Sequence, residues 1–282
     1  RTAPKGNTSA AVGMLMAIVG TVLKTEIISY ELIIVGLIVG GAVGALFAKR
    51  VEMTSMPQLV ALFNGFGGLS SLLVATAEVY KGSLPATFTL STISLSILIG
   101  SITFSGSLVA FAKLQGLMRG TPLVFKGTQI FNGLLILAVI VMTVLSILNP
   151  DQLFDYILWI IIFSLVVGYY FVVPIGGADM PVVIALLNSF SGLAAAATGF
   201  VIQNDALIIS GALVGASGII LSNIMCKGMN RTIWNVLFVG IKVSTSSATS
   251  GEGVQKTAKS YEPEDTVVIF ENAKQVIIVP GY

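Results

Sequence analysis

The sequence predicts an all-α integral membrane protein with about eight transmembrane helices in two parallel four-helix repeats, followed by a short C-terminal cytoplasmic fragment. Hydrophobic residues make up 55% of the 282 residues and charged residues only 10%. The mean hydropathy of +0.95 lies far above that of a soluble domain. One fourteen-residue phrase occurs twice, as MPQLVALFNGFGGL at 56–69 and MPVVIALLNSFSGL at 180–193. A polytopic membrane protein built from an internal repeat follows from these observations.

Eight apolar runs are each long enough, or nearly so, to cross a hydrocarbon core of about 30 Å. Charged and turn-forming residues separate them, as expected between helices. The runs occupy residues 8–23, 30–48, 57–79, 88–112, 129–148, 153–173, 180–203 and 206–226.

The charges between these runs predict the orientation of the helices in the membrane. Alternate loops carry nearly all the basic residues on one side, and only Lys24 and Lys81 lie on the other. Positively charged loops face the cytoplasm, which also places the C-terminal tail there. The basic side carries Arg1, Lys5, Lys49, Arg50, Lys113, Arg119, Lys126, Lys227 and Arg231.

The repeated phrases start the third and seventh predicted helices. Because four crossings separate them, both helices run from the cytoplasm outward, and the repeat is parallel. Two four-helix halves related by an axis near the membrane normal follow, an arrangement that some transporters share.

The composition changes after the last apolar run, which predicts three regions. Residues 1–230 form the transmembrane domain, and 231–260 form a linker rich in Ser, Thr and Gly. Residues 261–282 contain a helix-like EPEDTVVIFENAK and a strand-like QVIIVPGY, as at the start of an α/β nucleotide-binding domain.

The composition also limits the chemistry. There is no histidine, which is the side chain most used for proton transfer near neutral pH and the commonest metal ligand. The single cysteine, Cys226, belongs to no metal-binding or redox motif. A net charge of +2 gives no sign of nucleic-acid binding, so we expect neither a metal nor a nucleic-acid partner.

Polar residues inside the apolar runs predict a layer at one depth. Asn64 and Asn188 each lie eight residues after their Met-Pro pair, roughly 12 Å along a helix. Counted back from the basic residues that end their helices, four serines reach a similar level. They are Ser105, Ser107, Ser217 and Ser222.

A polar group at this depth requires a partner, a cavity or a function, because hydrocarbon offers no hydrogen bonds. One interpretation is that these side chains only bond one another across helices. The other is that they hold a file of waters through which protons move, with the titrating group supplied elsewhere.

Three residues at the cytoplasmic side are candidates for gating or coupling. Asp179 precedes the second Met-Pro pair, where it either caps the helix or relays protons at the mouth of a polar passage. Lys227 and Arg231 stand where the last helix meets the linker, and snorkelling to the interface also explains them.

Small residues recur at intervals of four and predict close helix packing. These stripes are Gly36, Gly40 and Gly44, then Ser191, Ala195 and Gly199, and finally Gly211 and Gly215.

Five phrases together resemble the membrane portion of the beta subunit of proton-translocating NAD(P) transhydrogenase. They are VEMTSMPQLVALFNGFGGL, TFSGSLVAFAKL, GGADMPVVIALLNSFSGLAAAATGF, GALVGASGIILSNIMCKGMNR and VIIVPGY, and they span nearly the whole chain. The resemblance implies a proton channel coupled to hydride transfer from NADH to NADP in soluble domains. It also implies a bacterial inner membrane and a dimeric assembly.

The same resemblance implies NADP and NAD as cofactors of the full complex, with neither bound by this fragment and no hydride-transfer site in it. The implied partners are the chain's own NADP-binding domain and alpha subunits that bring membrane helices and an NAD-binding domain. The chain is expected to be trimmed at both ends relative to the family.

Residue by residue, the matching phrases imply channel lining for Asn188 and Ser107, a cytoplasmic gate at Asp179, and a coupling segment from Lys227 to Arg231. Some members have a channel histidine where this sequence has Asn64. In members with a separate small alpha-type subunit, that partner's helix is the source of such a histidine.

Two other functional classes stay open on the sequence. A secondary transporter with the same parallel repeats predicts solute flux without nucleotides. A purely structural subunit predicts that both asparagines can be replaced without loss of proton movement.

Overall fold

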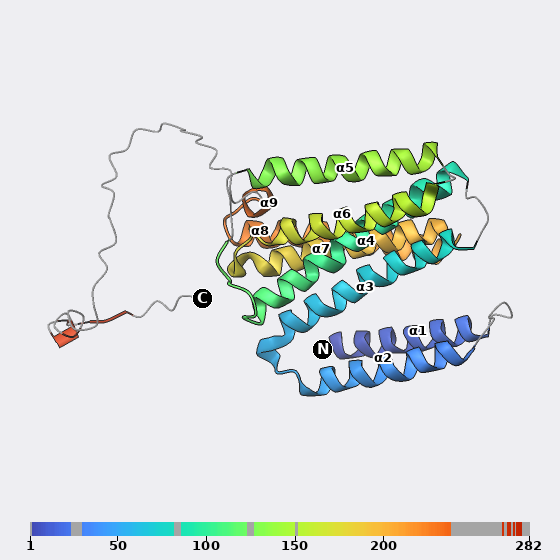
Figure 1. Cartoon of the computed structure of the whole chain (residues 1–282). Helices are drawn as coiled ribbons and strands as arrows, with labels where there is room; N and C mark the ends of the chain where they lie inside the picture. Colours follow the sequence, from blue (N-terminus) through green and yellow to red (C-terminus); the bar gives the residue numbers. More distant parts are fainter. Residues whose placement is uncertain are drawn as a thin grey trace. The chain divides into compact units, whose positions relative to one another are not determined.

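The computed structural model describes residues 2–23, 30–81, 86–122, 127–149 and 152–237, together with 267, 270, 271, 273 and 275–277. The described parts form helices and turns without a strand, which confirms the all-α prediction (Figure 1). The long helices are α1 (Ala3–Val22), α2 (Tyr30–Arg50), α3 (Met56–Val79), α4 (Thr87–Leu114), α5 (Thr128–Leu148), α6 (Leu153–Val172), α7 (Met180–Val201) and α8 (Asp205–Gly228). The short elements are the 3₁₀ turns η1 (Met53–Ser55) and η3 (Gly177–Asp179) and the helix α9 (Ile233–Leu237).

Seven helical segments in the described ranges are long and apolar enough to cross a membrane, and they correspond to α2 through α8. These match seven of the eight predicted spans and confirm an integral membrane protein. The eighth, expected over 8–23, is helical as α1 but lies outside the seven. Its first turns carry Lys5, Asn7, Thr8 and Ser9, which lower its hydropathy.

The chain divides into two compact units, residues 1–59 and 60–282. In the first unit, α2 has no buried residue. A Cβ added at Gly36, Gly40 or Gly44 would meet nothing within 4 Å. Among the residues that the structure describes, none packs closely against the predicted seam along these glycines.

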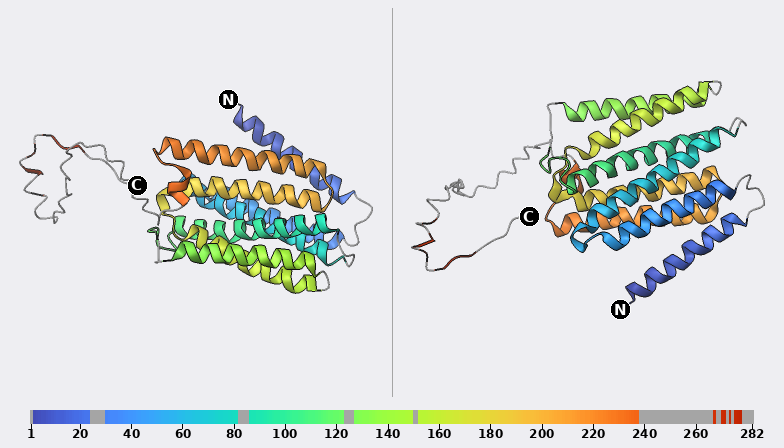
Figure 2. Two further views of the ribbon diagram at one scale, coloured as in Figure 1. Left: turned by 90° about the horizontal axis from the view of Figure 1, so that it is seen from above. Right: turned by 60° about the horizontal axis from the view of Figure 1, so that its bottom comes forward.

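The second unit is a bundle in which helices α3 to α8 run side by side (Figures 1 and 2). Its core has two apolar clusters, one toward each end of the bundle. The first surrounds Val173, Ile175, Met180 and Cys226, and the second surrounds Ile93, Ile97, Ile157 and Ile160. We call the end with the first cluster the basic end, since α4 and α8 finish there with Lys113 and Lys227 in their last turns.

The seam between α7 and α8 brings the two backbones together. A Cβ on Gly192 would lie 2.4 Å from the amide nitrogen of Gly215, and one on Gly211 would lie 2.5 Å from that of Ala196. Only glycine permits so close an approach, and small residues drive helix association where lipid removes the hydrophobic force. The packing prediction is confirmed for Gly211 and Gly215, and Gly192 joins them.

The repeated phrases have the same local form. Each helix of the pair, α3 and α7, follows a 3₁₀ turn and starts at the methionine of its Met-Pro pair. Proline fits there because the first turn of a helix has no partner for its amide. Both helices begin toward the basic end, as a parallel repeat requires (Figure 1).

The first residues of the predicted linker include a short helix. Helix α9 begins at Ile233, two residues after Arg231, and its Val236 is fully buried in the apolar cluster at the basic end. The rest of 231–260 and most of 261–282 lie outside the described residues, so the predicted start of an NADP-binding domain stays a prediction.

Candidate functional site

A hydrogen-bonded polar cluster joins three helices inside the bundle. The Asn64 amide on α3 donates from Nδ2 to Ser107 Oγ on α4 over 2.9 Å. The Ser191 hydroxyl on α7 donates to Asn64 Oδ1 over 2.7 Å. Ser107 is 1% exposed, while Asn64 and Ser191 are half-buried. We call Asn64, Ser107 and Ser191 the amide cluster.

The second repeated asparagine does not join this cluster. Asn188 is exposed, and no described residue forms a hydrogen bond with it. The residue of α7 that meets Asn64 is Ser191, three positions further along and roughly 4.5 Å deeper. Asn64 and Asn188 lie at equal distances from the starts of their own helices. The two helices are shifted along their axes relative to each other, however, so Asn64 meets Ser191 and not Asn188.

The other predicted serines bond within their own helices. Ser105 donates to Ser101 O over 3.0 Å and faces α6, since a Cβ on Gly168 would meet its hydroxyl. Exposed Ser217 donates to Val214 O, and buried Ser222 donates to Gly218 O, each over 2.9 Å. The structure does not bring these three to the amide cluster, and their part in a proton path stays a prediction.

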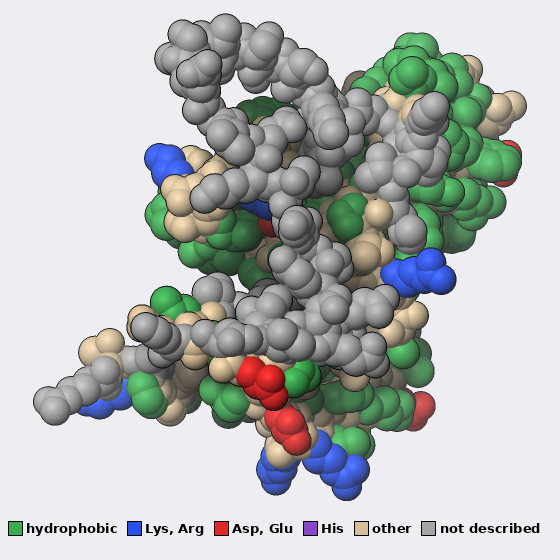
Figure 3. Space-filling model, turned by 90° about the vertical axis from the view of Figure 1, so that its left-hand side faces the viewer, with side chains coloured by type: hydrophobic (Ala, Val, Ile, Leu, Met, Phe, Trp, Pro, Cys, Tyr) green, Lys and Arg blue, Asp and Glu red, His purple; other side chains and the backbone are tan. Residues whose placement is uncertain are grey.

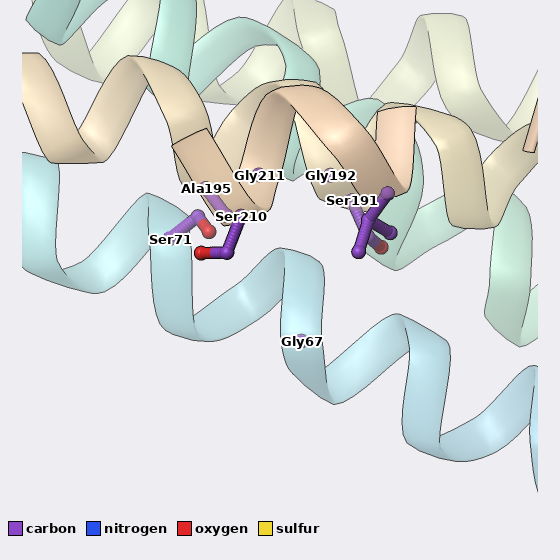
Figure 4. A pocket seen from close by; sticks show the side chains of 8 residues that line it. Gly67, Ser71, Ser191, Gly192, Ala195, Ser210 and Gly211 are labelled. Carbon is purple, nitrogen blue, oxygen red and sulfur yellow. The ribbon is translucent and has the colours of Figure 1, made fainter. Parts of the chain in front are cut away.

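A hollow of about 270 Å³ adjoins the amide cluster at Ser191. Figure 4 shows Gly67 and Ser71 on α3 facing the α7–α8 pair, with Ser191 at one end of the hollow and Ser210 at the other. Every lining side chain but one is Gly, Ala or Ser, so the space is wide enough for water or for side chains from another helix. The lining residues are Gly67, Ser71, Ser191, Gly192, Ala195, Ser210, Gly211 and Val214.

A second buried polar contact lies further from the basic end. Ser96 on α4 and Thr198 on α7 share a hydrogen bond of 2.7 Å, and both are nearly fully buried. Ser96 also donates to Ser71 O over 3.4 Å, on the helix that lines the hollow. Polar groups therefore continue beyond the level of the amide cluster.

Sequence reasoning missed Ser191, Ser96 and Thr198 as polar-layer residues. Ser191 was assigned to a packing stripe, yet it lies three residues after Asn188 and so shares its face of the helix. In the repeat it replaces Gly67, and this glycine-to-serine difference was the available signal.

An ion pair closes the basic end of the bundle. Arg231 Nη1 lies 2.9 Å from Asp179 Oδ1 and 2.8 Å from Oδ2. The Asp179 side chain is 8% exposed, against 50% for Arg231. Figure 3 is viewed from this side and shows separate Lys or Arg and Asp or Glu side chains among hydrophobic ones.

This pairing replaces the capping role considered for Asp179. Asp179 occupies the N-cap position of α7, but its side chain makes no capping hydrogen bond. Its carboxylate is directed to Arg231, whose own backbone amide is fixed by Cys226 O over 2.9 Å. Lys227 is exposed at the end of α8 and is not part of the pair.

Comparison with known proteins gives a consistent family match. The family model for the NAD(P) transhydrogenase beta subunit matches residues 1–282. Two sequences named NAD(P) transhydrogenase subunit beta, from Rhodospirillum rubrum and from its strain ATCC 11170, are each 44% identical over 290 residues. The alignment covers 100% of this chain and 62% of each relative, so the chain spans less than two thirds of their length.

Proposed function

Because this chain belongs to the NAD(P) transhydrogenase beta subunit family, we propose that it forms the proton-conducting membrane part of such an enzyme. In the complete enzyme, proton flow across the membrane is coupled to hydride transfer from NADH to NADP. That transfer takes place in soluble domains and not in the membrane bundle. The protein lies in a bacterial inner membrane with its C-terminal tail in the cytoplasm.

The observation that carries this proposal is the amide cluster. Asn64, Ser107 and Ser191 place an amide and two hydroxyls together in a region otherwise lined by apolar helices. Each hydroxyl both donates and accepts, and the amide offers both kinds of group at fixed positions. Such a set orders a short file of waters, and protons move along the file without being carried by the amide itself.

The titrating group comes from a partner in this proposal, because the chain has no histidine. The hollow beside Ser191 supports this view, since its small lining side chains leave space for side chains from a helix of an alpha subunit. A histidine on that helix would face Asn64 and Ser191 and would exchange protons with the ordered waters.

Coupling operates at the basic end through the Asp179–Arg231 pair. Arg231 pairs with Asp179, and α9 follows it at the start of the segment that we expect to join the bundle to the NADP-binding domain. A change of nucleotide state that moves this segment would break the pair and alter the side to which the amide cluster is open. Exposed Lys227 lies near the same segment, at the end of α8. In this coupled reaction, inward proton flow favours the formation of NADPH.

Proteoliposomes containing the reconstituted alpha–beta complex test this function. Adding NADH and NADP is expected to change the internal pH in step with hydride transfer. Hydride transfer by the intact complex without any proton movement would refute the proposal. The family match does not favour a secondary transporter, which would instead move a solute when nucleotides are absent.

A further inference from the structure

Lys113 is a buried cation that the proposed mechanism does not use. It lies in the last turn of α4 and is 5% exposed. Among the residues that the structure describes, no carboxylate forms an ion pair with it. A buried ammonium is costly unless it is compensated, so its partners reveal its role.

Those partners are two backbone carbonyls at the end of another helix. The Lys113 Nζ donates to Val173 O over 2.5 Å and to Ile175 O over 2.7 Å. Val173 is the C-cap of α6, where carbonyls lack helical partners and the helix dipole is negative. The ammonium therefore satisfies two carbonyls at the C-terminal end of α6, which lie 60 and 62 residues further along the sequence.

The segment held in this way, residues 173–179, leads directly to Asp179. It is also tied at Gly177, whose amide donates to Gly120 O over 2.9 Å just beyond α4. Because the two ties come from α4 and the chain after it, α4 determines where the segment lies. The segment then presents the Asp179 carboxylate to Arg231.

We propose that Lys113 is the positioning residue for the Asp179–Arg231 pair, acting through the carbonyls of Val173 and Ile175. A side chain at the end of α4 thereby decides the geometry with which the bundle meets the segment after α8. This inference rests on the proposed function for the use made of that geometry, but the geometry itself can be tested independently.

Cys226 provides that independent measurement. It is the only cysteine of the sequence, is fully buried, and packs in the same apolar cluster as Val173 and Ile175. If the segment 173–179 loses its anchor, the cluster opens and the thiol becomes accessible. Maleimide modification of Cys226, followed by peptide mass spectrometry on the intact complex, reports this opening.

The variants are Lys113→Met, Lys113→Arg and, as the control, Lys49→Met at an exposed lysine ending α2. Losing both charge-assisted hydrogen bonds is expected to raise the modification rate about tenfold or more in Lys113→Met. Lys113→Arg keeps the charge and should stay within about twofold to threefold of wild type, as should Lys49→Met.

The ratio of protons moved to hydrides transferred distinguishes a positioning role of Lys113 from a purely structural one. Lys113→Met is expected to lower the number of protons moved per hydride transferred, whereas simple destabilisation would leave that ratio unchanged in the assembled complex. Wild-type Cys226 modification in an assembled Lys113→Met complex overturns the inference. If that variant does not assemble, Lys113→Leu decides in the same way, since it also has no donor for the two carbonyls and a wild-type rate there also overturns the inference. Because modification does not depend on proton flow, failure of the proposed function would not by itself change this readout.

Discussion

Replacing Asn64 by leucine tests the amide cluster most directly. Leucine has the same branched heavy-atom skeleton as asparagine, although it is larger, and it neither donates nor accepts hydrogen bonds. The variant therefore removes both interhelical hydrogen bonds, of 2.9 and 2.7 Å. The freed hydroxyls of Ser107 and Ser191 can turn to carbonyls of their own helices, as other serines of the bundle do.

The expected cost in stability is therefore modest. Interhelical hydrogen bonds in membranes contribute about 0.6–1.7 kcal/mol each, which gives roughly 1–3 kcal/mol for the pair. The rate of proton movement is expected to change more than the stability. Each water beside this position would lose a hydrogen-bonding partner, which makes it less favourable for water to occupy the site. A penalty of about 2 kcal/mol at the rate-limiting position slows proton transfer roughly 30-fold.

The assay is nucleotide-driven pH change in proteoliposomes containing the Asn64→Leu complex, with thermal melting in detergent as the check on folding. Asn223→Leu is the matched control, because Asn223 is an exposed asparagine on α8 outside the cluster. Proton movement at the wild-type rate in a folded Asn64→Leu complex would refute the role assigned to the amide cluster.

Three further predictions use the same preparations. Ser107→Ala is expected to slow proton movement about tenfold by removing the acceptor of the Asn64 amide, whereas Ser105→Ala, which loses only a bond within α4, should change it less than about twofold; equal effects would contradict this assignment. Gly192→Ala should lower the free energy of unfolding by about 1–3 kcal/mol, measured by thermal melting, because its Cβ would lie 2.4 Å from a backbone nitrogen, while Gly133→Ala, with open space, should not destabilise. Asn188→Leu is expected to slow coupled pumping in the complete complex, and unchanged pumping would remove Asn188 from the proton path.

The positions of the helices and the parallel repeat were predictable from the sequence. Long apolar runs separated by charged turns follow from the thickness of the hydrocarbon core, which every span has to match. The boundaries of α3, α4 and α7 agree with the predicted runs to within a few residues. Asn64 could also be selected, because an amide inside an apolar helix is unusual wherever the helix packs.

The partners of these residues were decided only by the tertiary structure. Sequence spacing paired Asn64 with Asn188, but the axial shift of α3 against α7 brings Ser191 to Asn64 instead. Asp179 reaches Arg231 across 52 residues, and Lys113 reaches the end of α6.

The reason is that some properties belong to one segment, whereas others depend on how two helices pack together. Hydropathy and helical period are read along one segment and are imposed by the bilayer and the backbone. The rotation and axial shift of one helix on another depend on close contacts such as that of Gly192 with Gly215, which no single segment contains. The sequence alone thus determined which segments cross the membrane and which polar groups they bring with them, while helix packing determined which of those groups meet.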